Sequence, residues 1–135
     1  MKKLYQVLLI DDDNITNYMH KIVIEDCAIS EHILLSNSGD EALECLQGLN
    51  NCPELVFLDI NMPAMDGFEF LQEIQKLSLP GQQEMVIVVL STSTNPYDIQ
   101  KINRLGEYEY LNKPLTNDKL MTLLHKHFPA LAGIS

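Results

Sequence analysis

Short runs of apolar residues alternate with longer segments in which apolar residues recur at helical spacing, and this pattern repeats five times. The runs are expected to be strands, at Gln6–Ile10, His32–Ser38, Glu54–Asp59, Met85–Ser91 and Tyr108–Asn112. The fourth run is the most apolar, which is typical of a central strand buried on both faces. The alternation predicts a parallel sheet with helices on both faces.

Each run is followed by a residue type that favours the start of a helix. After the first run, apolar residues at i, i+3, i+4, i+7 and i+8 predict an amphipathic helix, with its apolar side formed by Ile15, Tyr18, Met19, Ile22 and Val23. The expected caps are Asp13, Ser38 (with Glu41), Asp66 (with Glu69), Asn95 (before Pro96) and Thr116.

The chain length of 135 residues fits one domain over residues 1–135, with no output domain apparent beyond it. The segment Leu77–Met85 runs slightly long and turns at Pro80-Gly81 before the fourth strand. No segment is long enough to cross a bilayer and the first apolar run reaches acidic residues early, so no signal peptide, no membrane partner and a cytoplasmic location are expected.

The charge and the cysteine pattern narrow the function classes. The formal charge is −10 and no basic run interrupts it, so direct nucleic-acid binding is not expected, whereas a cation or a basic protein partner is. No CxxC pair occurs, and small apolar roles in a reducing compartment are expected for Cys27, Cys45 and Cys52. The four histidines have no ligand-like spacing, so surface or helix positions are expected for His20, His32, His125 and His127.

Charged and hydroxyl side chains stand at the carboxyl ends of four of the five predicted strands. They are Asp11, Asp12, Asp13, Asp59, Ser91 and Lys113. One such residue by itself is usually a cap or a turn residue. In open parallel sheets, however, functional groups gather outside the carboxyl ends of the strands. Their coincidence at one edge therefore predicts a functional site.

These residue types suit metal-assisted phosphoryl transfer. Mg²⁺ (or Mn²⁺) prefers oxygen ligands, which Asp12 and Asp59 can supply as carboxylates and Asn61 as a backbone carbonyl, while Asp11 can hold a metal-bound water. Asp59 can then act as a nucleophile that passes through an aspartyl phosphate. The groups expected to face the other phosphoryl oxygens are Lys113 and Ser91.

The motifs VLLIDDD, LDINMPAMDG, VIVVLSTS and YLNKPLT resemble, in order and spacing, those of response-regulator receiver domains of two-component signalling. The resemblance covers essentially the whole chain and is to single-domain, chemotaxis-regulator-like receivers. It implies a flavodoxin-like, doubly wound α/β fold, (βα)5, with a five-stranded parallel sheet of order 2-1-3-4-5. It also implies Asp59 as phosphoacceptor, Asp11 and Asp12 as the acidic pair, Ser91 as the switch hydroxyl and Lys113 as the family's lysine.

Further expectations come from the resemblance alone. The Lys113–Pro114 peptide bond is implied to be cis, Tyr110 to turn between outward and inward rotamers, and Asn61 and Ser93 to tune dephosphorylation. The implied donor is a histidine kinase or a histidine phosphotransfer protein. This chain is implied to be a signalling domain rather than an enzyme, and to be monomeric or to dimerise on phosphorylation. The implied output is the binding of a downstream partner to its fourth helix, fifth strand and fifth helix.

Three alternatives stay open. The start LLIDDDNIT also resembles phosphatases of the haloacid-dehalogenase type, in which Asp11 would be the nucleophile and Asp13 the general acid, but Asp59 would then have no role. A flavodoxin-type binding module would place phosphate beside three acids that repel it. A pseudo-receiver would keep the fold as a scaffold without phosphorylation. Turnover of small phosphoesters with Mg²⁺ distinguishes a phosphatase from a receiver.

Overall fold

A computed structural model describes residues 3–132, and five parallel strands form its sheet in the order β2-β1-β3-β4-β5. The strands are β1 (Leu4–Ile10), β2 (Ser30–Ser36), β3 (Leu55–Leu58), β4 (Val86–Ser91) and β5 (Glu109–Asn112). The predicted parallel sheet and its 2-1-3-4-5 order are confirmed. The predicted strands differ from the observed ones only at their ends, because apolar runs do not mark where pairing stops.

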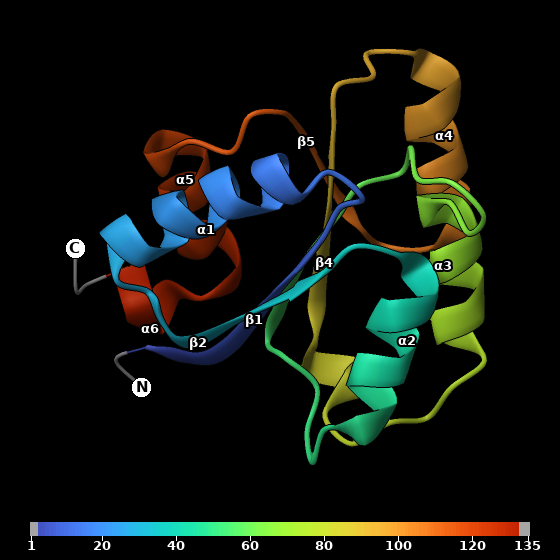
Figure 1. Cartoon of the computed structure of the whole chain (residues 1–135). Coiled ribbons are helices and arrows are strands. Elements are labelled where there is room, and N and C mark those ends of the chain that lie inside the picture. The colour runs from blue at the N-terminus through green and yellow to red at the C-terminus, as the bar shows by residue number, and fades with distance from the viewer. Residues whose placement is uncertain (1–2, 133–135) are drawn as a thin grey trace.

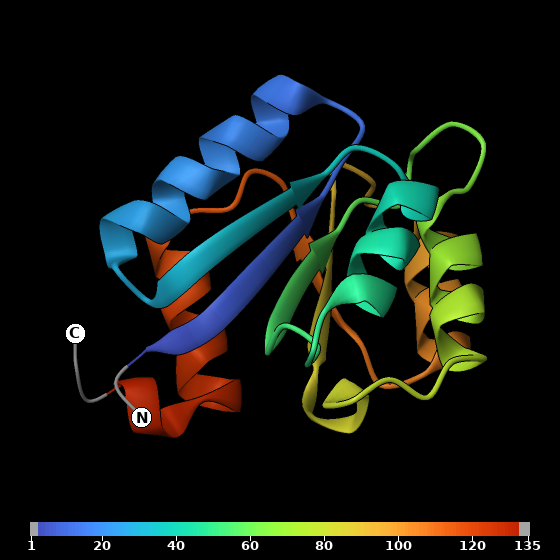
Figure 2. The ribbon, with the colours of Figure 1, turned by 60° about the horizontal axis from the view of Figure 1, so that its bottom comes forward.

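Helices cover both faces of the sheet, as Figures 1 and 2 show. One face carries α1 (Asn14–Cys27), α5 (Asn117–His127) and α6 (Pro129–Ala132). The other carries α2 (Gly39–Gly48), α3 (Gly67–Gln75) and α4 (Pro96–Leu105). Strand side chains alternate between the two buried layers: Leu9, Phe57 and Leu90 belong to the first, and Leu8, Val56 and Val89 to the second. The prediction that β4 is buried on both faces is confirmed.

The predicted helix caps are all confirmed. The caps are Asp13, Ser38, Asp66, Asn95 and Thr116, and each side chain accepts a hydrogen bond from a backbone N–H of the first turn. Asp66 and Glu69 form a complete capping box, with the Glu69 carboxylate accepting the Asp66 N–H. Next to it, a Cβ at Gly67 would lie 2.8 Å from the Asp59 carbonyl oxygen. Glycine therefore lets α3 start directly against the strand end that carries Asp59.

The orientation of α1 differs from the expectation. The helix is present, but the apolar residues that defined its predicted side are mostly exposed: Ile15, Tyr18, Met19 and Ile22. The buried residues of α1 are Asn17, His20 and Ile24. The Asn17 amide donates to the Asp11 and Ser36 carbonyl oxygens, at 3.1 Å each. The inner side of this helix is therefore polar around Asn17 and His20, where it meets loop backbone at the edge of the sheet, whereas Ile24 joins the apolar core. His20, expected at a surface or helix position, lies on the helix and is buried.

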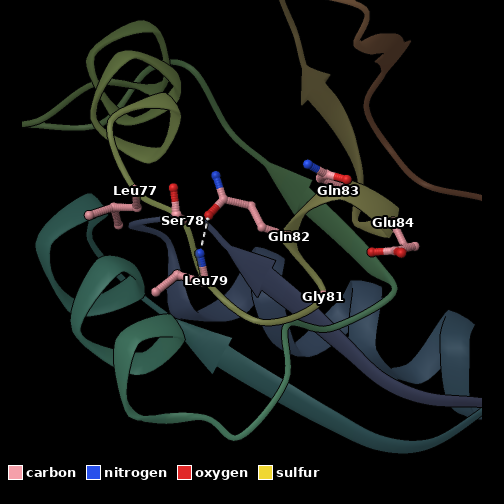
Figure 3. Close-up of a pocket in the computed structure, with 7 residues that line it drawn as sticks. All are labelled: Leu77, Ser78, Leu79, Gly81, Gln82, Gln83 and Glu84. Carbon is pink, nitrogen blue, oxygen red and sulfur yellow. Dashed lines mark hydrogen bonds between the residues drawn. The ribbon is translucent and has the colours of Figure 1, made fainter.

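The long segment before β4 folds into a loop that contains the 3₁₀ helix η1 (Gln82–Glu84). The Gln82 side chain holds this loop by accepting from the Leu79 N–H at 2.8 Å (Figure 3). The same side chain donates to the Ile74 carbonyl oxygen, also at 2.8 Å. The hollow beside it has a volume of about 440 Å³. It lies at the amino end of β4, away from the acidic residues at the carboxyl ends. Within residues 3–132, no helix has the length and apolar character needed to cross a membrane.

Candidate functional site

The strand ends bring the predicted residues to one edge of the sheet. Asp11 directly follows β1 and Asp59 directly follows β3, and these two strands pair with Ile10 beside Leu58. The Asp59 N–H continues this ladder by donating to the Ile10 carbonyl oxygen, at 3.0 Å. On the other side, the Lys113 N–H donates to the Ser91 carbonyl oxygen, at 2.9 Å. Parallel pairing in register therefore places all four groups at the same level.

The side chains at this edge form a compact charged cluster. The Lys113 Nζ lies 2.6 Å from an Asp11 carboxylate oxygen and 3.4 Å from an Asp59 carboxylate oxygen. Carboxylate oxygens of Asp11, Asp12 and Asp59 all lie within 4.8 Å of one another. Asp59 is only 6% exposed and Asp11 only 4%, whereas Asp12 is exposed. Three converging carboxylates with one exposed member suit a hard divalent cation that keeps some of its water.

The electrostatics of the cluster set Asp59 apart. Burial and the neighbouring Asp11 charge raise the pKa of Asp59, although Lys113 and the Asn61 N–H, at 3.3 Å, act in the opposite direction. Burial lowers the pKa of Lys113, but its hydrogen bond to Asp11 and the Asp59 charge outweigh this, so its pKa is raised. The ionised form of Asp59 is thus disfavoured in the folded protein, and it lies beside a lysine that stays protonated.

This unfavourable ionisation predicts that Asp59→Asn raises the free energy of unfolding in metal-free buffer by about 0.5–2 kcal/mol. Because the folded-state pKa of Asp59 is raised, its ionised form destabilises the fold above that pKa, and the penalty disappears as the pH falls to the unfolded value of 3.8. Urea unfolding between pH 7 and pH 4 should therefore show the gain shrinking with acid. The control Glu44→Gln removes an exposed carboxylate of α2 and should change little; equal stability of wild type and Asp59→Asn at pH 7 would contradict the prediction.

Asp13 does not join the cluster as a further acid. Its carboxylate caps α1 by accepting from the Ile15 and Thr16 N–H groups, at 3.0 and 3.4 Å, and from the Thr16 hydroxyl at 3.0 Å. The Thr16 hydroxyl bond and the Ile15 backbone bond lower the pKa of Asp13. The Asp13 carboxylate therefore accepts its hydrogen bonds from the first turn of α1, as predicted for a helix cap.

The loop after β4 carries the remaining predicted residues. Ser91 is fully buried, and its hydroxyl accepts the Ser93 N–H at 3.1 Å. The Tyr110 hydroxyl donates to the Ser93 carbonyl oxygen at 2.9 Å, so the ring is turned toward this loop. The Lys113–Pro114 peptide bond is cis. The backbone of Ser93 therefore links the Ser91 hydroxyl to the Tyr110 hydroxyl.

Three polar residues beside the site were not among the predicted site residues. Asn17 joins the loops after β1 and β2, and the buried His20 Nε2 accepts the Leu115 N–H at 3.4 Å. Burial and the neighbouring Lys113 charge lower the pKa of His20, which favours this acceptor form. The Asn112 amide donates to the Ser93 carbonyl oxygen at 3.2 Å. The sequence offers one signal for such residues, a polar side chain inside the apolar pattern of a helix. Asn17 and His20 show this signal, whereas Asn112 does not.

A groove of about 310 Å³ runs from α1 to the loop after β5. Its lining residues are Thr16, Met19, His20, Val23, Thr92, Lys113, Pro114 and Leu115. Met19 is 58% exposed and belongs to the apolar residues of α1 that face away from the sheet. The charged cluster is therefore bordered on one side by an accessible apolar surface.

Comparisons with known proteins agree with this geometry. Residues 7–125 match the family model described as the response regulator receiver domain. The nitrate/nitrite response regulator protein NarL of Escherichia coli K12 is 31% identical, over 89% of this chain and 53% of its own length. A two component response regulator from Cytophaga hutchinsonii has a crystal structure with a TM-score of 0.82 and 31% identity, over 94% of this chain and 98% of that chain. The chemotaxis protein CheY4 of Vibrio cholerae, 26% identical, gives a TM-score of 0.79, over 93% and 99% of the two chains. This chain spans about half the length, or less, of curated relatives.

Proposed function

This chain belongs to the response-regulator receiver family, and from that premise we propose that Asp59 accepts a phosphoryl group from a phosphohistidine donor. Receiver domains are signalling domains that accept phosphoryl groups and interact with histidine kinases. The observation that carries the assignment to Asp59 is its position: a buried carboxylate of raised pKa, 3.4 Å from the Lys113 ammonium and beside two further acids. The donor is a histidine kinase or a histidine phosphotransfer protein.

The chain's own groups account for the steps of transfer. An Asp59 oxygen attacks phosphorus and forms the O–P bond while the P–N bond of phosphohistidine breaks; the imidazole nitrogen keeps the electron pair and takes a proton. Lys113 places a positive charge at the developing phosphoryl oxygens, and the Ser91 hydroxyl contacts another of them. Asp11 holds Lys113 in place through its 2.6 Å ion pair.

The acid cluster fits the divalent cation that receiver domains of this family bind. Its ligands would be the Asp12 and Asp59 carboxylates and the Asn61 carbonyl oxygen, with Asp11 holding a metal-bound water. Bound there, Mg²⁺ or Mn²⁺ supplies the positive charge that offsets the gathered carboxylates and phosphoryl oxygens. The spacing of the carboxylate oxygens, within 4.8 Å, supports the assignment.

The exposed apolar residues of α1 are proposed to receive the donor protein. Ile15 is 71% exposed and Tyr18 59%, and a soluble protein gains nothing for its own fold from such side chains in water. Met19 joins them to the groove that ends at Lys113. A donor helix with apolar side chains around its phosphohistidine could cover this surface while its phosphoryl group reaches Asp59.

Output is proposed to pass through the loop after β4. Phosphorylation adds negative charge and acceptor oxygens at Asp59, toward which the Ser91 hydroxyl moves. The Tyr110 side chain then favours its inward rotamer, and the surface of α4, β5 and α5 shifts toward the arrangement that a partner binds. Asn61 and Ser93, which flank the phosphoryl position, set the lifetime of the modified state.

The proposal is tested by incubating the protein with Mg²⁺ and acetyl phosphate and measuring its intact mass. We expect one phosphoryl group on the wild type and none on Asp59→Asn. An unlabelled wild type would indicate the pseudo-receiver alternative. Continuous release of phosphate from a small phosphoester, retained in Asp59→Asn and lost in Asp11→Asn, would instead favour the phosphatase.

A further inference from the structure

One carbonyl group fastens the loop after β4 to β5. The Ser93 carbonyl oxygen accepts two hydrogen bonds, from the Tyr110 hydroxyl at 2.9 Å and from the Asn112 amide at 3.2 Å. Residues two positions apart on a strand project from the same face, so both donors reach the same side of the loop. A carbonyl oxygen has two lone pairs and can accept both bonds at once.

The position of Ser93 determines what surrounds the Ser91 hydroxyl. The Ser93 N–H donates to that hydroxyl at 3.1 Å. The Ser93 hydroxyl donates to the Asp98 carboxylate of α4 at 2.6 Å and accepts the Asn95 N–H at 3.2 Å. A tether on the Ser93 carbonyl group is therefore two residues away from the switch hydroxyl and is also connected to the first turn of α4.

Asn112 is itself held firmly. Its carbonyl oxygen accepts a hydrogen bond from the Lys119 Nζ at 2.7 Å, and the next residue donates its backbone N–H to the Ser91 carbonyl oxygen. Its backbone is thus anchored to α5 on one side and to β4 on the other. The short Asn112 side chain therefore projects toward the loop from a backbone that is held on both sides. It can keep its hydrogen bond to the loop when the Tyr110 side chain changes rotamer.

We propose that Asn112 is a positioning residue: as the second donor to the Ser93 carbonyl oxygen, it holds the loop after β4 against β5 before phosphorylation. The loop then stays in place when the Tyr110 ring turns outward, and the Ser91 hydroxyl is already close to where the phosphoryl group arrives. The inference rests on the proposed function only for the role of Ser91. The tether itself exists in the unphosphorylated protein and can be measured there.

Hydrogen–deuterium exchange of the peptide covering residues 91–98, in unphosphorylated protein, measures the tether. Loss of one net hydrogen bond should make Asn112→Ala exchange about three- to tenfold faster. Asn112→Asp keeps the size but removes the donor, so it should exchange at least as fast. Asn50→Ala removes an exposed asparagine of another loop and should match wild type, and urea midpoints should show that all variants are folded.

Labelling of Asp59 by acetyl phosphate in the same variants tests the consequence for Ser91. We expect Asn112→Ala to be labelled several-fold more slowly, because the competent loop arrangement is less populated. A Tyr110→Phe, Asn112→Ala cycle should show the two donors to be coupled rather than additive. Unchanged exchange in Asn112→Ala, or faster exchange with an unchanged labelling rate, would overturn the inference. If the wild type is not labelled at all, the proposed function fails, while the exchange comparison still decides whether the tether exists.

Discussion

Removing divalent cations with a chelator is expected to slow the labelling of Asp59 by about 100-fold or more, and Asp12→Ala should do the same with Mg²⁺ present. Asp59 is buried beside Asp11, and burial together with that charge already raises its pKa. An arriving phosphoryl group adds further negative oxygens, which one lysine does not offset. Asp12 is exposed, so its loss should weaken transfer while the fold is kept.

The neighbouring Asp13 offers a matched control for Asp12. It is also an exposed acid in the same loop, but its carboxylate caps α1. Asp13→Ala should therefore lower stability and leave the labelling rate close to that of wild type. Intact-mass time courses measure both variants. Equal loss of labelling in both would mean that the loop charge as a whole matters, rather than a cation held by Asp12.

Replacing Lys113 by alanine is expected to have the second large effect: weak, slow labelling of Asp59 and no response of the downstream partner. The ammonium group makes ion pairs with Asp11 and Asp59, at 2.6 and 3.4 Å. Its removal leaves two buried carboxylates unpaired and takes away the positive charge that faces the phosphoryl oxygens. We expect a labelling rate lower by about 100-fold.

The stability of Lys113→Ala distinguishes this role from general damage. Loss of the ion pairs should lower the free energy of unfolding by about 3 kcal/mol, and added Mg²⁺ should recover part of this by binding the freed carboxylates. Lys76→Ala removes an exposed lysine of the α3 C-terminal cap and should alter neither property. A full partner response from Lys113→Ala would refute the assigned role.

The fold could be predicted because its signals are local and repeated. Apolar runs of strand length, each followed by a capped helical pattern, leave few arrangements other than a wound parallel sheet. The α1 helix shows the limit of prediction from such local signals. Its spacing correctly indicates a helix, but the side chains of Ile15 and Tyr18 serve a surface, while Asn17 and His20 face inward. Spacing defines the two sides of a helix without stating which side is buried.

The location of the candidate site could also be predicted from the sequence. The acids, Ser91 and Lys113 follow strand ends, and parallel strands bring such ends together, so their proximity follows from sequence order. The residues that support them could not be found in this way. Asn112 and His20 bond to the backbone of segments 19 and 95 positions away, and the residue types of those segments do not identify the bonded backbone groups. Which groups are held in place became visible only in three dimensions.

Asp59 is proposed to be the one acid of the cluster that carries the phosphoryl group. Reduction of the labelled protein with borohydride converts an aspartyl phosphate to homoserine, and peptide mass mapping then locates it. We predict homoserine at position 59 alone, dependent on both Mg²⁺ and the phosphodonor. Homoserine at Asp11, Asp12 or Asp13, or none anywhere in a protein that has gained phosphoryl mass, would contradict the account.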